Sequence, residues 1–288
     1  MYGLSSMTAP LKRVALRRPG PAMLSADPQK WHYGPTFDPQ RIGAIHDTFA
    51  GLLEKAGVET LWMSGDDQGF ADAVFTYDAS LMTRKGAILL SPGKLLRAGE
   101  QDLHRRFYDE HQIAIVGEIT GDGRAEGGDT LWVDDTTLAV GRGVRTNQAG
   151  IDQLSQILGA QGVQVLAYDL PLYQGEAACL HLMSIISPVA EKTALIYAPL
   201  MPVAFWQLLK DKGYRLLEAP IDEFEASGGL NLNVLAVAPG HCIMIDGYPQ
   251  TRALMESAGV EVQVFEGTAL CVACEGGPTC MTRPILRG

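Results

Sequence analysis

Residues 130–168, TLWVDDTTLAVGRGVRTNQAGIDQLSQILGAQGVQVLAY, decide the fold class of this chain. Two short runs rich in apolar and β-branched residues, 130–133 and 137–140, predict two adjacent strands. Residues 147–161 then have helical spacing, with a good N-cap residue at the start and the apolar side chains on one stripe. A third strand is predicted at 164–168. The order strand, strand, helix, strand is therefore the unit from which we build the fold.

The same order recurs about five times along the chain, with Gly and Pro in nearly every gap between elements. Further strands are predicted at residues 14–16, 58–62, 73–76, 87–91, 113–116, 182–186, 193–197, 215–218, 233–238, 242–245 and 261–265. Further helices are predicted at residues 38–56, 91–111, 201–212 and 248–258. No Pro/Ser-rich linker or charge block long enough to mark a domain boundary interrupts them. We therefore predict a single repetitive α/β domain that spans residues 1–288.

A doubly wound parallel sheet is the structural alternative, because it also alternates strands and helices. That fold usually carries a Gly-rich phosphate-binding turn after an early strand. The early strands predicted here lack such a turn. The repeats share no visible tandem sequence identity, so the order of the elements is the main argument for a repetitive fold.

The composition indicates a compact protein with a large core, since 47% of its 288 residues are hydrophobic and 19% are charged. The net charge of -10, from 33 acidic and 23 basic residues, argues against a nucleic-acid or anionic-membrane partner, because both need clustered Lys and Arg. A small cationic substrate would instead be attracted. The sequence has neither a long apolar run nor a signal peptide at Met1, so we expect a cytoplasmic protein.

The cysteines form an odd and unevenly spaced set, which argues against a secreted disulfide framework. They are Cys179, Cys242, Cys271, Cys274 and Cys280. Cys271, Cys274 and Cys280 with His181 could form a zinc site, but one close pair without a second is a weak zinc signal. A thioredoxin-like role lacks the βαβ unit that should follow the pair. We therefore predict neither a metal nor a cofactor, and at least one free thiol.

Three Gly-rich patches stand out at residues 126–129, 141–147 and 275–280. Glycine pairs let the backbone turn sharply and let a ligand approach closely, although ordinary turns need them too. The middle patch suits an anion because a helix follows it, yet it lacks the spacing and the Lys of a P-loop. Arg145 in this patch could bind a substrate carboxylate bidentately, or it could form a surface ion pair.

In chain order these features resemble the arginine deiminase and amidinotransferase superfamily, and the compact length is most like the dimethylarginine dimethylaminohydrolases. The matching segments are residues 11–14, 72–78, the patches of Glu126 and Arg145, 180–182, 233–235 and Cys280. They cover nearly the whole chain. The resemblance implies a five-bladed, pseudo-symmetric α/β propeller of ββαβ modules around a central channel, the pentein fold. This agrees with the order of elements predicted above.

The resemblance also assigns roles to individual residues. It makes Cys280 the nucleophile and His181 the acid and base, and it gives Asp78 and Glu126 the task of gripping a guanidinium group. Substrate contacts would come from Asp72, Asp129, Arg145 and Met183. The expected ligand is therefore a small cationic guanidino compound. A homodimer is compatible with the sequence, which carries no signal for the oligomeric state.

The chemistry that these residues suit is hydrolysis of a guanidinium group in two substitutions. A thiolate is both a good nucleophile and a good leaving group, and a covalent intermediate divides a difficult reaction into two easier steps. Arginine or an N-substituted arginine would give citrulline together with ammonia or an amine. Two alternatives remain open. An amidinotransferase would use an amine in place of water, and a guanidino-binding protein would keep the pocket without catalysis.

Met183 is where the sequence departs from the related families. In arginine deiminases and amidinotransferases the residue two after the His is usually Asp, and in dimethylarginine hydrolases it is typically Lys. If residues 182–186 form a strand, then Met183 and His181 share one face, because side chains two apart on a strand point the same way. We expect an adaptable apolar side chain here to suit an N-alkylated guanidine.

Overall fold

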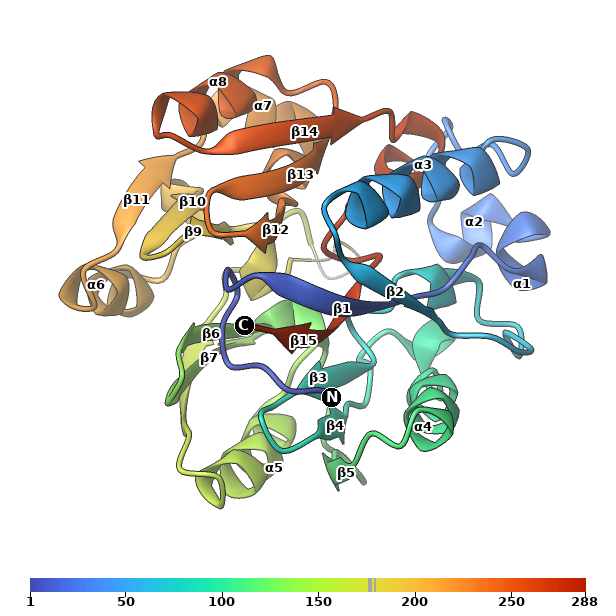
Figure 1. Ribbon diagram of the computed structural model, residues 1–288, viewed down its shortest axis with the longest axis horizontal. Coiled ribbons are helices and arrows are strands. Elements are labelled where there is room, and N and C mark those ends of the chain that lie inside the picture. The colour runs from blue at the N-terminus through green and yellow to red at the C-terminus, as the bar shows by residue number, and fades with distance from the viewer. Residues whose placement is uncertain (176–177, 179) are drawn as a thin grey trace.

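The computed structural model describes residues 1–175, 178 and 180–288, which leaves Cys179 outside the described residues. Five three-stranded sheets lie around a common centre in this part of the chain (Figure 1). The strands are β1 (Leu11–Leu16), β2 (Glu59–Trp62), β3 (Ser80–Met82), β4 (Ala87–Leu89), β5 (Ile115–Glu118), β6 (Thr130–Asp134), β7 (Thr137–Arg142), β8 (Gln164–Asp169), β9 (Ile186–Ala190), β10 (Thr193–Ile196), β11 (Arg215–Glu218), β12 (Leu235–Ala238), β13 (His241–Ile245), β14 (Glu261–Phe265) and β15 (Arg283–Arg287). The α-helices are α1 (Pro21–Leu24), α2 (Pro28–Trp31), α3 (Ile42–Lys55), α4 (Gln101–Glu110), α5 (Gln148–Gly159), α6 (Val203–Asp211), α7 (Ile221–Ser227) and α8 (Pro249–Ser257).

Each sheet has the same internal plan. In the sheet of β6, β7 and β8, the middle strand β7 pairs antiparallel with β6 and parallel with β8. A tight turn suffices for the antiparallel pair, whereas the parallel pair needs a crossover, which α5 provides. The helices α4, α6 and α8 make the equivalent crossovers and lie on the outside of the molecule (Figure 1). The predicted order strand, strand, helix, strand is confirmed.

One sheet is assembled from both ends of the chain. Its middle strand β1 pairs antiparallel with the C-terminal strand β15 and parallel with β2, across the crossover helix α3. A bridge between Gly3 and Leu286 adds to this closure. The strand β15 therefore takes the place that β3, β6, β9 and β12 hold in the other sheets.

Two predicted strands are wrong. The segment 73–76 overlaps a 3₁₀ helix, η1 (Ala71–Val74), and the strand of that module follows at β3. The segment 182–186 begins in another 3₁₀ helix, η4 (Leu182–Ser184), and the strand β9 follows it. Both segments are short, apolar and buried, and periodicity does not separate a buried strand from a buried helical turn.

The first strands of the sheets face the middle of the molecule, where β9 contacts β12 and β15 contacts β3. Apolar side chains of the strands and the crossover helices fill the space between the layers, as with Leu154 of α5 and Phe205 of α6, which are fully buried. Within the described residues, no helix has both the length and the apolar character that crossing a bilayer requires.

Candidate active site

A pocket of about 130 Å³ opens at one end of the molecule, where the loops that lead into the five first strands meet. Asp78 lies just before β3, and Glu126 lies just before β6. His181, Asn233 and Cys280 occupy the corresponding places before β9, β12 and β15. One side chain from each module thus reaches the same region, because the start of every first strand lies at the same end of the ring. Glu126 lies behind the pocket wall in contact with His181, while the other four line the pocket directly.

Cys280 is partly buried in this pocket, and its sulfur accepts hydrogen bonds from the side chain of Asn233 and the main chain of Gly277. Nδ2 of Asn233 lies 3.0 Å from Sγ of Cys280. Burial raises the pKa of the Cys280 thiol, and the negative charge of Asp78 acts in the same direction. The Asn233 hydrogen bond and the charge of His181 lower the pKa but do not outweigh burial. The thiol is therefore the stable form at neutral pH until a cation approaches it.

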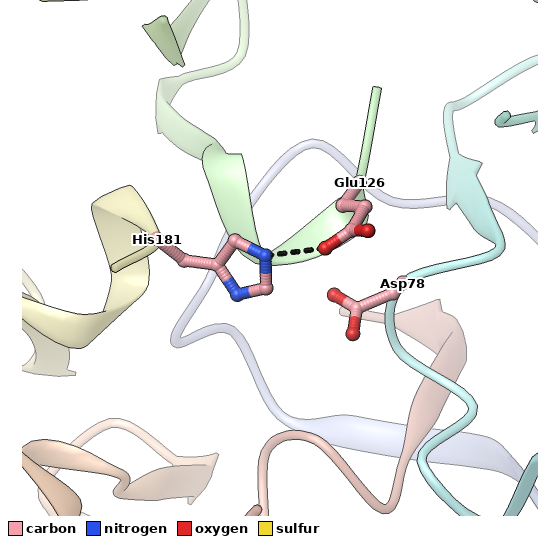
Figure 2. A group of neighbouring side chains, drawn as sticks. All are labelled: Asp78, Glu126 and His181. Atoms are coloured by element: carbon pink, nitrogen blue, oxygen red, sulfur yellow. Dashed lines mark hydrogen bonds and ion pairs between the residues drawn. The ribbon is translucent and has the colours of Figure 1, made fainter. Parts of the chain in front are cut away.

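His181 and Glu126 form a short contact that Figure 2 shows together with Asp78. Nε2 of His181 lies 2.6 Å from Oε2 of Glu126, whose side chain has no exposed surface. Oε1 of Glu126 accepts the main-chain N–H groups of Gly93 at 2.9 Å and Lys94 at 3.1 Å. Burial would raise the pKa of Glu126, but the hydrogen bond and charge of His181 hold it well below its usual value. The carboxylate is therefore ionised and fixes the imidazole.

Gly128 makes room for this arrangement. A Cβ atom at position 128 would collide with the His181 ring, so the close approach of the imidazole to the backbone requires glycine. The N–H of Gly128 also donates to Oδ1 of Asp78 at 2.9 Å. Gly128, in the Gly-rich patch at residues 126–129, thus serves two site residues: its missing side chain makes room for His181, and its N–H binds Asp78.

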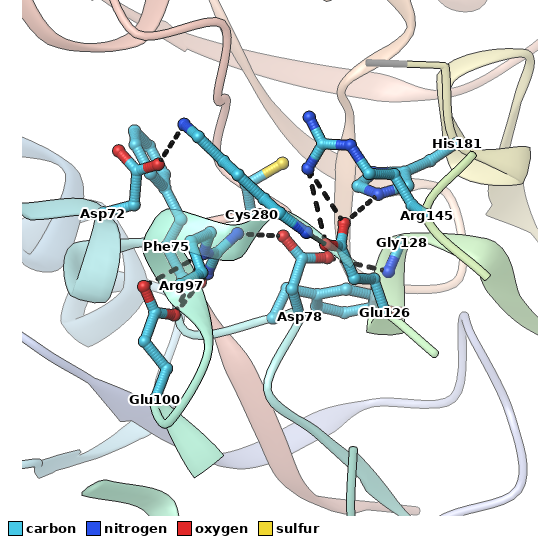
Figure 3. A network of polar contacts seen from close by, with 12 residues as sticks. Asp72, Phe75, Asp78, Arg97, Glu100, Glu126, Gly128, Arg145, His181 and Cys280 are labelled. Atoms are coloured by element: carbon cyan, nitrogen blue, oxygen red, sulfur yellow. Dashed lines mark hydrogen bonds and ion pairs between the residues drawn. The ribbon is translucent and has the colours of Figure 1, made fainter. Parts of the chain in front are cut away.

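Arg97 fixes the other oxygen of Asp78, in the network drawn in Figure 3. Its Nη1 lies 2.5 Å from Oδ2 of Asp78, and its Nη2 lies 2.7 Å from Oε2 of Glu100 and 2.9 Å from the carbonyl oxygen of Phe75. Burial raises the pKa of Glu100 to about 7 in spite of the Arg97 charge. Arg97 was not predicted from the sequence, because nothing in its surroundings indicates its distant partner Asp78.

Asp72 and Arg145, two of the residues expected to contact the substrate, lie at the wall of the same pocket. Oδ1 of Asp72 accepts the hydroxyl of Tyr33 at 2.8 Å, and Oδ2 lies 2.6 Å from Nζ of Lys94. Nη1 of Arg145 lies 3.4 Å from both carboxylate oxygens of Glu126. At this wall of the pocket, Lys94 and Arg145 therefore each lie beside a carboxylate, that of Asp72 and that of Glu126.

Asp129 does not line the pocket, which corrects its predicted place among the substrate contacts. Its side chain is fully buried, and Oδ1 accepts the main-chain N–H of Leu182 at 3.0 Å while Oδ2 accepts the hydroxyl of Thr146 at 2.6 Å. Burial raises the pKa of Asp129 to about 6. Through its hydrogen bond to Leu182, the residue after His181, Asp129 contacts the turn that carries His181.

Met183 and His181 both line the pocket. They do not lie on one face of a strand, which was the reason for expecting them there. His181 is the N-cap residue of the 3₁₀ helix η4, and its main-chain N–H donates to Oγ of Ser184 at 3.1 Å. The argument from strand alternation is therefore wrong, although both side chains still reach the pocket.

Among the described residues, one group of side chains has the spacing of metal ligands, namely Asp78, Glu126 and His181, whose ligand atoms lie within 4.8 Å of one another. Both carboxylates already lie beside arginine side chains, which disfavours a dication. Cys271 and Cys274 are not in this group, and burial raises the pKa of each thiol. The arrangement is thus better suited to an organic cation with several N–H donors.

The family model for arginine deiminase matches residues 70–205 and 200–287 of the chain. A dimethylarginine dimethylaminohydrolase of Streptomyces coelicolor is 28% identical over 279 residues, which cover 92% of this chain and 96% of that protein. An arginine deiminase of Mycobacterium avium is 28% identical over 247 residues, with 74% of this chain covered. The match spans 60% of the length of that deiminase.

Two solved structures show the same fold. The dimethylarginine hydrolase of Pseudomonas aeruginosa in complex with citrulline has a TM-score of 0.77 at 22% identity, and the match covers 97% of this chain and all of that one. An amidinotransferase from Microseira wollei, of the saxitoxin biosynthetic pathway, has a TM-score of 0.81 at 18% identity. That match covers 99% of this chain and 97% of the other. The five-bladed α/β propeller fold predicted from the sequence is therefore confirmed.

Proposed function

The chain belongs to the arginine deiminase family, and from this premise we propose that it is a cysteine-dependent hydrolase of arginine or an N-substituted arginine. The observation that carries the proposal is the meeting of Cys280, His181 and Asp78 in one pocket, with Glu126 bonded to His181. Residues 1–288 would act as one domain, which the pairing of β1 with β15 supports. The products would be citrulline and either ammonia or an amine.

The first step would be attack by Cys280 on the guanidinium carbon. A thiol with an ordinary pKa of about 8.5 is mostly protonated at neutral pH, and burial raises the pKa of Cys280 further. A guanidinium cation bound beside the sulfur would favour the thiolate, since an opposite charge at contact distance stabilises the charged form. Substrate binding would therefore activate the nucleophile, because it favours loss of the thiol proton, which His181 would accept and then hold for the leaving nitrogen.

Asp78 would hold the guanidinium group in place for this attack, whereas Glu126, which was also expected to grip this group, lies behind the pocket wall and would act through His181. Each carboxylate offers about four lone-pair positions, so Asp78 can accept substrate N–H groups in addition to those of Arg97 and Gly128. The charge of the substrate would also be compensated inside the pocket, where an unpaired cation is costly to desolvate.

His181 would act twice. It would first give a proton to the nitrogen that leaves, so that the C–N bond breaks and an amidino thioether remains on Cys280. It would then take a proton from water, which attacks the same carbon, and the C–S bond would break to return the thiolate and release the ureido product. Its contact with Glu126 orients the imidazole for both proton transfers.

The proposal is tested by incubating the protein with arginine, asymmetric dimethylarginine and agmatine, and by measuring the ureido product and the released ammonia or amine. We expect turnover by the wild type and no turnover by Cys280→Ser. His181→Gly should also lose turnover, because both the protonation of the leaving nitrogen and the hydrolysis of the thioether then lack their acid and base.

The assay also separates the alternatives. Transfer of the amidino group to an added primary amine, with little ureido product, would identify an amidinotransferase instead. Tight binding of a guanidine without any turnover, by wild type and by Cys280→Ser alike, would identify a binding protein and defeat the hydrolase proposal. Circular dichroism of each variant provides the control for folding.

A further inference from the structure

Asp78, the carboxylate that would hold the guanidinium group, already has a cation of the protein beside it. Nη1 of Arg97 lies 2.5 Å from Oδ2 of Asp78, and the two side chains are 5% and 7% exposed. An arginine this close to a buried carboxylate cancels most of the negative charge that attracts a second cation. Asp78 would therefore bind a guanidinium group weakly unless another group compensated Arg97.

Glu100 is the group that compensates Arg97. Oε1 and Oε2 of Glu100 each lie 3.0 Å from Nε of Arg97, and Oε2 also lies 2.7 Å from Nη2. The Glu100 side chain is 2% exposed and lies outside the set of described residues that line the pocket. It would therefore act on a bound ligand through Arg97 and Asp78, without touching the ligand.

Two other buried carboxylates beside the pocket have cationic partners of their own. Oδ2 of Asp72 lies 2.6 Å from Nζ of Lys94. Oε2 of Glu126 lies 2.6 Å from Nε2 of His181 and 3.4 Å from Nη1 of Arg145. Each of these two carboxylates is thus compensated by at least one cation, and neither leaves an excess of negative charge for a substrate.

Asp78, Arg97 and Glu100 differ in this respect, because here two carboxylates share one cation. Figure 3 shows Arg97 between them. When both carboxylates are ionised, the three groups carry one negative charge in excess. Glu275 also lines the pocket, but it is exposed and solvent screens its charge. A guanidinium group bound at Asp78 would complete a buried set of two cations and two carboxylates.

We propose that Glu100 is a positioning residue that sets the preference of the pocket for a cation, because it compensates Arg97 and leaves the charge of Asp78 available to the substrate. This role rests on the proposed function, since the ligand concerned is a guanidinium cation. Loss of the Glu100 charge should weaken the binding of a cation and spare the binding of a neutral ligand of similar shape.

The ionisation of Glu100 is coupled to the charges around it. The charged groups that act on it are Arg17, Arg97, Asp72 and Asp78. Burial raises the pKa of Glu100 to about 7, the Arg97 charge lowers it, and the two aspartates raise it. His104, one turn further along the chain, stays neutral because burial lowers its pKa to about 3. A bound cation would lower the pKa of Glu100, so the affinity for a cation should fall as the pH decreases through about 7.

The first test compares two ligands that differ in the charge of one group. Arginine carries a guanidinium group, whereas citrulline carries a neutral ureido group of nearly the same shape. Calorimetry with Cys280→Ser measures both affinities without turnover. When Glu100→Gln is added to this variant, arginine should bind about tenfold more weakly or worse, and the citrulline affinity should stay within about threefold. Equal losses for the two ligands would overturn the proposal, because they would indicate a structural role alone.

Further variants in the Cys280→Ser background separate charge from structure. Arg97→Gln with Glu100→Gln removes one charge of each sign, so it should recover part of the arginine affinity that Glu100→Gln alone loses. Glu100→Asp keeps the charge and should lose less affinity than Glu100→Gln. Glu118→Gln is the matched control, because Glu118 forms its ion pair with Arg105 outside the pocket, at 2.6 Å, and arginine affinity should stay within about twofold. A double variant that binds arginine no better than Glu100→Gln would contradict the proposal.

The pH dependence decides the question even if Glu100→Gln alone does not fold. In Cys280→Ser the ratio of arginine affinity to citrulline affinity should fall about tenfold from about pH 8 to about pH 5, since tenfold corresponds to one unit in the pKa of Glu100. The fall should be smaller when Arg97→Gln and Glu100→Gln are both added, although His181 is retained. The same fall in both proteins would overturn the role of Glu100 and leave the proposed function intact. Binding of neither ligand by folded Cys280→Ser would instead contradict the proposed function and the role of Glu100 together.

Discussion

The side-chain amide of Asn233 holds the sulfur of Cys280 and is itself held in one orientation. Nδ2 donates to Sγ of Cys280, and Oδ1 accepts the main-chain N–H of Thr279, both at 3.0 Å. Only the oxygen of the amide is able to accept the Thr279 N–H, so the NH₂ group has to face the sulfur. A hydrogen bond of this kind stabilises the thiolate more than the thiol and opposes the effect of burial.

Replacing Asn233 should therefore raise the pKa of Cys280. We expect a rise of about one unit for Asn233→Ala, since a hydrogen bond to an ion contributes about 1.5 to 3 kcal/mol and one unit corresponds to 1.36 kcal/mol. Asn233→Asp should raise it further through its negative charge. The pH dependence of alkylation of the free enzyme by iodoacetamide measures both values. A profile unchanged in both variants would show that the amide does not influence the thiolate.

The positioning role of Asp129 predicts an effect on kcat rather than on KM. Asp129→Asn keeps an oxygen for the N–H of Leu182, so its kcat should stay within a few-fold of the wild type. Asp129→Ala removes that acceptor and loosens the turn that carries His181, and kcat should fall about tenfold or more. Steady-state kinetics with the best guanidine distinguish the two roles. If Asp129→Ala raised KM without lowering kcat, Asp129 would instead have to be a substrate contact.

The repeated module could be predicted because it is local in the sequence. The antiparallel pair, the crossover helix and the third strand of each module lie within a short stretch, so strand and helix periodicity reveal them in order. The strand β15 was missed because it pairs with β1, at the other end of the chain, and its short run contains Pro284 between charged residues. No local pattern identifies such a strand.

The site could be predicted in part for a related reason. Cys280, His181, Asp78 and Glu126 occur in motifs whose order along the chain resembles a known family. Asn233 belongs to a quoted segment, but its contact with a sulfur 47 positions away follows only from the ring of modules. The Gly-rich patch at 126–129 contains two acids, and nothing in its sequence distinguishes them. Only the structure shows that Glu126 contacts the His181 ring, whereas Asp129 binds the main chain of Leu182.

The Glu126 carboxylate predicts a specific pH dependence of stability. Its pKa in the folded protein is held below the value of 4.5 for an ordinary Glu. The ionised group therefore stabilises the fold above about pH 4.5, and this contribution is lost as the pH falls toward the folded pKa. Glu126→Gln should lower the free energy of unfolding by about 2 kcal/mol at pH 7, with a smaller difference below pH 4.

Urea unfolding of wild type and Glu126→Gln at several pH values measures this difference. Glu59→Gln is the matched control, because Glu59 forms an exposed ion pair with Arg13 that should contribute less than about 1 kcal/mol. If the two variants lose the same free energy, or if the Glu126→Gln difference is constant with pH, then the His181 contact does not stabilise the carboxylate.

Arg145 should distinguish substrates that carry a carboxylate from those that do not. Arg145→Met removes a bidentate donor worth about 1.5 to 3 kcal/mol, so kcat/KM for arginine should fall about 10- to 150-fold. Agmatine has no carboxylate, and its kcat/KM should change by only a few-fold. Arg145→Lys should recover part of the activity toward arginine. Equal losses for arginine and agmatine would mean that Arg145 acts on Glu126 and not on the substrate.

Met183 should set the preference between methylated and unmethylated guanidines. Its thioether lines the substrate pocket beside His181, where methyl groups on a guanidinium nitrogen would find apolar contact in place of an acceptor. In Met183→Asp a carboxylate would face that nitrogen, and methylation would then remove the N–H donors that satisfy the carboxylate. We expect the ratio of kcat/KM for asymmetric dimethylarginine to that for arginine to fall about tenfold or more in this variant.

Met183→Leu is the control for this comparison, because it keeps the volume and the apolar character of the side chain and should leave the ratio within about threefold. Thermal unfolding of both variants checks that a buried Asp has not simply destabilised the pocket. The ratio of kcat/KM for asymmetric dimethylarginine to that for arginine in the wild type also tests this role of Met183. If free arginine is a far better substrate than the methylated compound, then an apolar residue at this position does not select N-alkylated guanidines, and Met183 has only a packing role.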